Sequence, residues 1–278
     1  MLLSEPKPFQ GQVHENLYQT WMPPPPLSHW VHYFWQLHVP IGEYSYLSVP
    51  DNCVDLIISL YELDDAVLVS PFTSPIVYPL IGPTCYFGVR FRLLGQHTLL
   101  SEPVTEWSQK SHQMPIKDLF LPSLIEQFQE SLSFNEGFSH RCLRFAKAML
   151  EHIAKPEVDP RVLKFVRYCY QPSSRISLKD LAPQQLGITD RQLRRLTLQY
   201  LGVSPKTFCK VLRFQNTLRA WQTTHDNMAW ADWYFDQSHY SREFKQLAGV
   251  SPKYFSEMSV LYNRTTSQSR IILPNDNT

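Results

Sequence analysis

Three arginines at helical spacing are the side chains of this 278-residue chain best suited to binding a nucleic acid. Arg191, Arg194 and Arg195 stand at positions i, i+3 and i+4, which lie on one face of an α-helix. A guanidinium group can grip O6 and N7 of guanine with two hydrogen bonds, or it can pair with a phosphate. The pattern therefore indicates either a basic surface that reads DNA or an ordinary solvated face of a helix.

A repeated corner follows this basic segment. The pentapeptide Gly-Val-Ser-Pro-Lys occupies residues 202–206 and again residues 249–253, 47 positions later. Glycine suits the left-handed residue just after a helix, and Ser-Pro suits the N-cap and first position of the next helix. The repeat predicts a duplicated unit in which one helix ends, the chain turns sharply, and another helix begins.

Aligning the copies by 47 residues predicts two equivalent helices. The first follows a capping box formed by Thr189 and Gln192 and runs from Asp190 to about Tyr200; the second follows Asp236, also a good N-cap residue. The inward stripes are Leu193, Thr197 and Tyr200 in the first helix and Tyr240, Phe244 and Leu247 in the second. The outward faces are Arg191, Arg194, Arg195 and Leu198 in the first and Ser238, Ser241, Arg242 and Lys245 in the second.

A short helix is expected before each of these helices, at 178–185 and 227–234, and a longer helix at 205–222 joins the two units. Short helix, tight turn and second helix is the helix-turn-helix arrangement, in which the second helix enters the major groove. A joining helix of this length is about 25 Å long. It would hold the two units about one DNA turn (~34 Å) apart, so that one chain reads two successive grooves or bends the DNA to meet them.

Residues 176–258 resemble the DNA-binding domain of the AraC/XylS family of bacterial transcription regulators. The resemblance rests on the two corners and on three segments, Gly-Ile-Thr-Asp-Arg-Gln-Leu at 187–193, Arg-Phe-Gln at 213–215 and Asp-Gln-Ser-His-Tyr-Ser-Arg-Glu-Phe-Lys at 236–245. It implies these DNA-binding residues: Asp190, Arg191, Arg194, Arg195, Gln237, Ser238, His239, Ser241, Arg242 and Lys245. Within that set, Gln237 and Lys245 are expected at phosphates.

Two departures from the family pattern concern the turns. Trp233 stands where the family usually has glycine, and the stretch 181–187 is one residue longer than usual and contains Pro183. Either change could alter how a helix is tilted into its groove. Because the second helix is also poorer in arginine, we expect the first helix to dominate base reading.

The amino-terminal half has the patterns of short strands. Residues 84–93 alternate apolar side chains with Arg90 and Arg92, and residues 49–60 contain a turn followed by a β-branched apolar run. With Leu-Leu-Ser-Glu-Pro at 99–103, these segments resemble the amino-terminal domain of a less-studied AraC subgroup, which implies a β-rich, barrel-like fold without an established common ligand. The expected fold class is thus α+β, with a β-rich domain followed by an all-α double helix-turn-helix domain.

Four regions are expected along the chain. Residues 1–120 form a β-rich sensor or regulatory domain, and residues 121–155 form a helical linker or dimerisation segment. Residues 156–260 form the DNA-binding domain, whose start is marked by Pro156 and Pro160, and residues 261–278 form a flexible tail. The helix at 139–153 is equally suited to pair with its own copy or to pack on its own domain.

The β-rich half offers little that points to catalysis or metal binding. Arg90 and Arg92 fit either a barrel interior that holds an anion or an outer face with salt bridges, and the second alternative is favoured. His29, His32 and His38 do not share one strand face, and no acidic ligand is suitably spaced. The five cysteines are scattered without a C-x-x-C pair, which is typical of idle thiols. We therefore expect no enzyme activity, no metal and no cofactor.

The formal charge divides unevenly. Residues 1–155 hold 9 basic and 15 acidic side chains, whereas residues 156–260 hold 15 basic and 9 acidic ones, so the second half favours a polyanion. The sequence shows neither a signal peptide nor an apolar run long enough to span a membrane, so the cytoplasm is expected.

These observations favour a sequence-specific transcription regulator. Its expected partner is double-stranded DNA, and RNA polymerase, a small effector and a second copy of the chain are further candidates. The alternatives are a metal-binding or catalytic β-barrel fused to a DNA-targeting domain, and an architectural protein that bends DNA without sequence preference.

Overall fold

The structure is a computed structural model that describes residues 6–13, 16–100, 102–108, 112–132, 136–171, 186–224, 228 and 230–263. The amino-terminal strands and short helices are β1 (Tyr18–Trp21), η1 (Leu27–His29), β2 (Val31–Ser48), β3 (Asp55–Ser59), β4 (Ala66–Val69), β5 (Ile76–Phe91), η2 (Gly95–Thr98), α1 (Val104–Ser108), β6 (Gln113–Pro115) and η3 (Ile116–Asp118). The later elements are α2 (Pro122–Ser131), α3 (Phe138–His152), α4 (Pro160–Cys169), α6 (Asp190–Leu201), α7 (Pro205–Thr224), α8 (Gln237–Ala248), α9 (Pro252–Glu257) and β7 (Leu261–Asn263).

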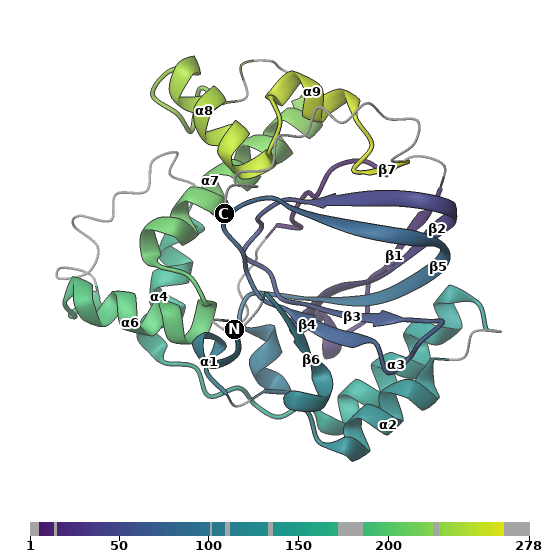
Figure 1. The fold of residues 1–278 in the computed structure, drawn as a ribbon. Helices are drawn as coiled ribbons and strands as arrows, with labels where there is room; N and C mark the ends of the chain where they lie inside the picture. The colour runs from purple at the N-terminus through teal and green to yellow at the C-terminus, as the bar shows by residue number, and fades with distance from the viewer. Residues whose placement is uncertain are drawn as a thin grey trace, which may run out of the picture.

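The described strands form one antiparallel sheet in the order β1-β2-β5-β3-β4-β6, with β7 added to β2. Its centre is the long β2–β5 pair, which runs from Val31–Phe91 to Ser48–Ile76 with register shifts after Val31 and after Val39. The sheet curls strongly but its two edge strands do not pair, so it is barrel-like without being closed (Figure 1). With the helical carboxy-terminal region, this makes the α+β, two-domain fold that the sequence predicts.

Helices α2 and α3 cover one face of the sheet. Phe128 of α2 stacks on Phe145 of α3 with ring centroids 4.5 Å apart, and Phe145 in turn contacts Phe34 and Phe87 of the sheet. All four rings are fully buried. Residues 121–155 are therefore not a free linker, because the apolar stripe of α3 lies in the core of the β-rich domain (Figure 1).

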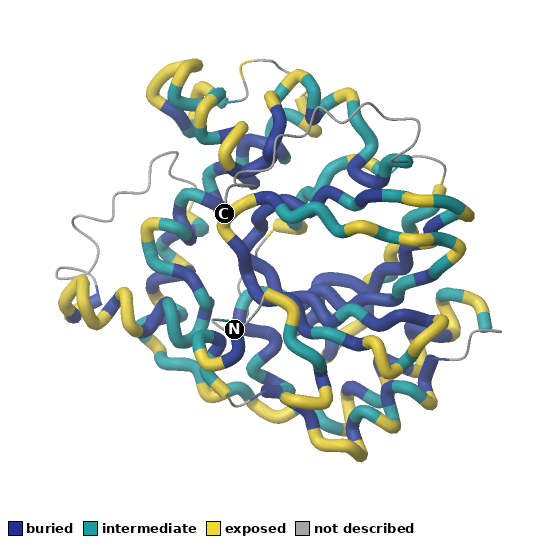
Figure 2. The backbone as a smooth tube through the Cα atoms, in the orientation of Figure 1, coloured by how far each residue is buried: buried dark blue, intermediate teal, exposed yellow. Residues whose placement is uncertain are grey.

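The helical region forms two further clusters on α7. The first packs α4 and α6 against Phe208, near the start of α7. The second packs α8 and α9 against Phe214 and Leu218, and Leu47 and Val49 at the end of β2 join it. Helix α7 thus lies against the sheet domain, while the outer turns of α6 and α8 stay exposed (Figure 2).

The tail expected to be flexible from residue 261 begins as a strand. Leu261–Asn263 forms β7, which pairs with Tyr44–Tyr46 of β2. Just before it, Val260 lies fully buried, and its amide donates to the carbonyl of Gln12. The prediction was wrong here because it rested on the polarity of the tail, whereas β2 offers an unpaired edge that a distant segment completes.

The helices predicted at 139–153, 190–200 and 205–222 all form, with ends shifted by at most two residues. The short helix expected at 227–234 is replaced, over its described residues, by consecutive turns that include one helical hydrogen bond, from the Tyr234 amide to the Trp230 carbonyl. The short helix expected at 178–185 lies outside the described residues.

Candidate nucleic-acid interface

Helix α6 presents the arginines as the spacing predicts. Thr189 accepts a hydrogen bond from the amide of Gln192, and the side chain of Gln192 accepts one from the amide of Thr189, so both halves of the capping box are present. The residues that face solvent are Asp190, Arg191, Arg194 and Arg195. Leu193 and Thr197 lie buried on the opposite side. The helix therefore has one face for the core and one basic face for a partner.

The arginine charges of α6 are largely uncommitted. Within the described part of the chain, neither Arg191 nor Arg194 has an ion-pair partner, and Arg195 makes a long 3.5 Å contact with the amide oxygen of Gln199 and lies near enough to Asp159 to help lower the pKa of that carboxyl. An exposed guanidinium without an internal carboxylate keeps its donors for a phosphate or a base edge. Asp190 at the helix start lies on the same exposed side and stabilises the amino-terminal turn.

Helix α8 divides its predicted DNA-binding residues between two faces. Ser238, Arg242 and Lys245 are exposed and follow one another at i, i+4 and i+7. Gln237 and Ser241 instead line a surface groove between α7, α8 and α9, beside the ring of Tyr240. The outward stripe of α8 therefore carries two basic side chains, whereas α6 carries three.

His239, the remaining predicted residue of α8, is engaged within the protein. Its ring meets that of Tyr234 edge-on at 5.3 Å, and its Nε2 lies 3.8 Å from the carboxylate of Glu243. Glu243 is itself held by Arg213 of α7 at 2.7 Å through both of its oxygens. Sequence reasoning missed this Arg213–Glu243 pair, which ties α8 to α7, although both residues lie in the motifs that carry the resemblance.

The unusual turn before α8 is filled by aromatic side chains. Tyr234 is buried between the rings of His239 and Tyr240, with the guanidinium of Arg213 5.0 Å from its ring centroid. Trp233 is half-buried, and its indole N–H has no hydrogen-bond partner among the described residues. Bulky side chains therefore occupy the turn where the family pattern places a glycine.

A cavity of about 380 Å³ lies on the other face of the curled sheet, away from α2 and α3. Six of its lining residues are aromatic: Tyr18, Trp35, Tyr46, Phe72, Tyr78 and Tyr86. The indole of Trp35 lies flat over Gly88 of the paired strand, where a Cβ atom would come within 2.0 Å of it, and its N–H donates to Asp55 at 3.2 Å. The volume is within the range of about 300–1,000 Å³ usual for small-molecule sites.

Arg90 lies at this cavity and is paired twice. Its guanidinium donates to Asp55 at 2.7 Å and meets Asp51 at 2.9 Å, and all three side chains are buried. Burial alone would lower the pKa of Arg90, but the two carboxylates raise it well above its usual value. Burial raises the pKa of Asp51 against the pull of Arg90. Arg90 therefore faces the interior, contrary to the favoured outer-face alternative, but it makes salt bridges rather than holding a free positive charge.

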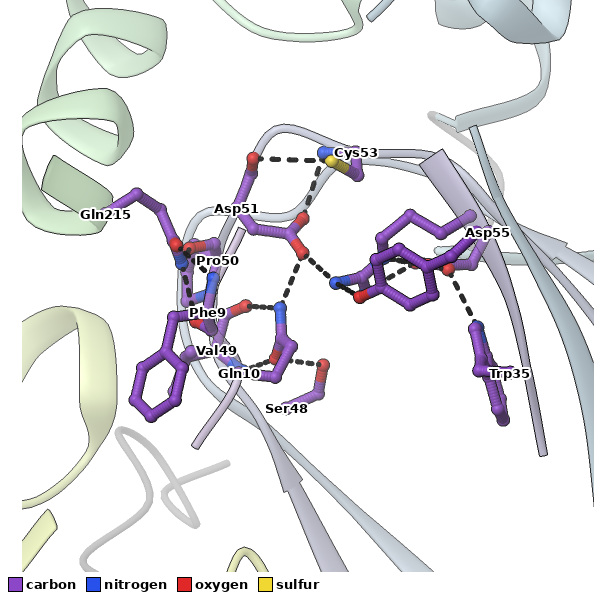
Figure 3. Close-up of polar contacts among 12 residues, drawn as sticks. Phe9, Gln10, Trp35, Ser48, Val49, Pro50, Asp51, Cys53, Asp55 and Gln215 are labelled. Atoms are coloured by element: carbon purple, nitrogen blue, oxygen red, sulfur yellow. Dashed lines mark hydrogen bonds and ion pairs between the residues drawn. The ribbon is translucent and has the colours of Figure 1, made fainter. Parts of the chain in front are cut away.

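Hydrogen bonds connect this cavity to α7 (Figure 3). Gln10, which lines the cavity, donates to Asp51 at 2.6 Å and accepts from the amide of Val49. Gln215 in the middle of α7 accepts from the amide of Phe9 at 2.9 Å and donates to the carbonyls of Phe9 and Pro50. Phe9 and Gln10 are adjacent in the chain, so one short segment contacts both α7, which joins the two candidate DNA-binding units, and the cavity. These residues were not predicted from the sequence. The available signal was the pair of acidic residues at positions 51 and 55, which stand beside an apolar run.

The described residues also bear on metal binding, membrane insertion and cysteine pairing. No group of three His, Cys, Asp or Glu side chains among the described residues is arranged to hold a metal ion. None of the helices in the described ranges combines the length and the apolar character needed to cross a membrane. Cys169 and Cys209 bring their sulfur atoms to 3.7 Å, and both are buried free thiols.

Comparison with known families identifies two segments of the chain. Residues 184–258 match a family described as a helix-turn-helix domain, which is of the AraC type, and residues 19–113 match a family described as a domain of unknown function. The first match contains α6, α7 and α8, and the second contains most of the sheet. No curated protein matches the chain.

Solved structures of ToxT from Vibrio cholerae match the chain at low similarity. An apo variant from strain SCE256 is 14% identical with a TM-score of 0.42, covering 80% of this chain and 91% of that one. ToxT from strain O395 is 12% identical with a TM-score of 0.42, covering 87% and 98%. The wild-type SCE256 protein bound to an unsaturated fatty acid is 13% identical with a TM-score of 0.38, covering 78% and 88%.

Proposed function

The carboxy-terminal part of this chain is an AraC-type helix-turn-helix domain, and we propose that the whole chain is a sequence-specific DNA-binding regulator of transcription. In this proposal α6 and α8 enter two successive major grooves on one side of the duplex, and residues 156–260 form the DNA-binding domain. The single observation that carries the proposal is the exposed, capped and unpaired arginine face of α6.

The geometry of α7 supports reading by both helices. At about 1.5 Å per residue, its 20 residues span roughly 30 Å, which approaches one turn of B-DNA. Figure 1 shows α6 and α8 at opposite ends of α7. The candidate contacts are Asp190, Arg191, Arg194 and Arg195 from α6 and Ser238, Arg242 and Lys245 from α8. The other predicted residues of α8, Gln237, His239 and Ser241, lie beside neighbouring parts of the helical region.

The β-rich domain is the regulatory part in this proposal. Its cavity is large enough for a small effector, and Gln10 and Phe9 link the cavity wall to Gln215 of α7. A ligand that moves Gln10 would alter the placement of α7 and so the spacing of the two DNA-binding helices. Contacts with RNA polymerase, pairing of two copies and a cytoplasmic location complete the proposal.

Selection from a pool of random-sequence DNA duplexes tests this function. The full-length chain is expected to enrich one motif with two half-sites about one helical turn apart. Replacing Arg191, Arg194 and Arg195 together by Ala should abolish the enrichment without lowering the melting temperature, because all three are exposed. Arg144→Ala, on α3 at the far side of the sheet, is the matched control. Failure of the unaltered chain to enrich any sequence would contradict the proposal.

A further inference from the structure

The charged groups of the cavity leave no place for a negatively charged ligand. Arg90 is the basic side chain among the cavity-lining residues, and both of its carboxylate partners are in direct contact with it. Each carboxylate is further fixed, Asp55 by the indole of Trp35 and Asp51 by Gln10 and the amide of Cys53. An incoming anion would have to displace one of two buried carboxylates from Arg90 and leave it without its positive partner, which is strongly unfavourable.

The remaining walls suit a positive charge. Aromatic rings present a negative face that attracts cations, and this attraction increases when water is excluded. Burial raises the pKa of Tyr78 to about 12 and raises the pKa of Tyr18 and Tyr46 as well, so these side chains stay neutral phenols and do not compete as anions. The exposed carboxylate of Asp65, also among the lining residues, adds a negative charge.

The domain already places a cation on a ring beside this cavity. The ammonium of Lys7 lies 4.1 Å from the ring centroid of Tyr33, whose hydroxyl accepts from Arg90 at 3.2 Å. Lys7 lies close enough to Arg90 for the two positive charges to interact, and the formal charges of Lys7, Arg90, Asp51 and Asp55 sum to zero. The apolar part of the walls, which includes Leu37, Ile57 and Leu80, would contact an uncharged body.

We propose that the cavity of the β-rich domain binds a small organic cation with an apolar body, its positive group lying among the aromatic rings. This inference rests on the proposed function only in treating the ligand as the effector of a DNA-binding regulator. Tyr86 contributes one of the rings on the side of the cavity formed by β5.

Three phenyl compounds of different charge test the proposal by calorimetry on the full-length chain. Benzyltrimethylammonium is the cation, neopentylbenzene is its uncharged isostere, and phenylacetate is an anion with the same ring. The cation is expected to bind about tenfold more tightly than the isostere, and phenylacetate should not bind. Equal or tighter binding of phenylacetate or neopentylbenzene, or no saturable binding of the cation at millimolar concentration, would overturn the proposal.

Single-residue variants test whether the cation binds in this cavity. Tyr86→Phe keeps the ring and should retain binding of benzyltrimethylammonium, whereas Tyr86→Leu should weaken it several-fold. Tyr61→Leu, an exposed tyrosine outside the cavity, is the matched control and should leave binding unchanged. Asp55→Asn removes one partner of Arg90 and should allow phenylacetate to bind. Unchanged binding in Tyr86→Leu would contradict the assignment to this cavity.

The DNA selection described above separates the two proposals. A chain that selects a DNA motif but binds none of the three compounds loses only the ligand assignment. A chain that binds the cation but selects no DNA keeps the ligand site and loses the regulator function.

Discussion

The two candidate DNA-binding helices, α6 and α8, both have an N-cap side chain and a glycine corner, but the partners of their other side chains differ. In α6 the arginines extend into solvent, and the helix is joined to the β-rich domain near its end, where His97 contacts the carbonyl of Tyr200 at 3.0 Å. In α8 the outer face is poorer in charge, and the Arg213–Glu243 pair fixes the helix to α7. The two units therefore have the same backbone frame, whereas the partners of their surface side chains differ.

The largest expected effect is on DNA binding, where substitutions in α6 and α8 should act differently. Arg194→Ala should weaken binding to a selected site by about 1–3 kcal/mol and relax the preference at one base pair, because it removes a candidate two-point base contact. Arg242→Ala should weaken binding to all sequences alike, as the loss of a phosphate contact does. Titration of selected and scrambled duplexes by fluorescence anisotropy measures both. If Arg242→Ala relaxes the preference as much as Arg194→Ala, the inequality proposed between the helices is wrong.

The attachment of α8 provides the next test. Arg213→Ala should lower the free energy of unfolding by about 1–2 kcal/mol, because it leaves the largely buried carboxylate of Glu243 without its partner. The double variant with Glu243→Gln should recover part of that loss. Urea unfolding of both variants measures the effect, with Arg242→Ala on the exposed face as the control. Additive losses in the double variant would show that the pair does not hold α8 in place.

Helix capping should affect both helices by similar amounts. Thr189→Ala and Asp236→Ala each remove an N-cap acceptor, for the amides of Gln192 and His239, and each should cost about 1 kcal/mol. Gln192→Ala should cost less, because it removes only the reciprocal bond that α6 possesses. Thermal unfolding followed by circular dichroism measures these differences. A loss for Asp236→Ala well above that for Thr189→Ala would show that the α8 cap does more than its counterpart.

The smallest expected effect is a loss of stability around His97 at acidic pH. Burial lowers the pKa of His97 below its usual 6.5, so the unfolded chain takes up the proton at a higher pH than the folded chain. The stabilisation by neutral His97 is therefore complete above pH 6.5 and is lost as the pH falls below it. At pH 5.5 the charged imidazole is unfavourable in its buried position beside α6, although it still donates to the Tyr200 carbonyl, so hydrogen exchange at the end of α6 should accelerate relative to α8. In His97→Gln, which does not titrate, this difference should disappear; its persistence would exclude His97 as the cause.

Local patterns predicted the helical half well. The caps at Thr189 and Asp236 and the left-handed glycines at 202 and 249 depend on residues within a few positions of one another, so the sequence displays them directly. The cavity was not predictable in this way, because Asp55 meets Arg90 only through the register of β3 on β5. The same holds for Gln215, whose partners lie 165 and 206 positions away. The roles of the DNA-facing side chains stay predictions, since they depend on a partner.

The strand β7 has a consequence for how the chain reaches this fold. Its partner residues in β2 are translated more than 200 positions earlier, so the sheet cannot be completed until residues 261–263 have been made. Until then Tyr44–Tyr46 expose free backbone groups on a β-edge, the kind of edge that recruits other chains. Pairing over such a sequence separation is also slow to form. Expression of the β-rich half alone should therefore yield an aggregation-prone product, and stop codons upstream of residue 261 should affect both halves of the molecule.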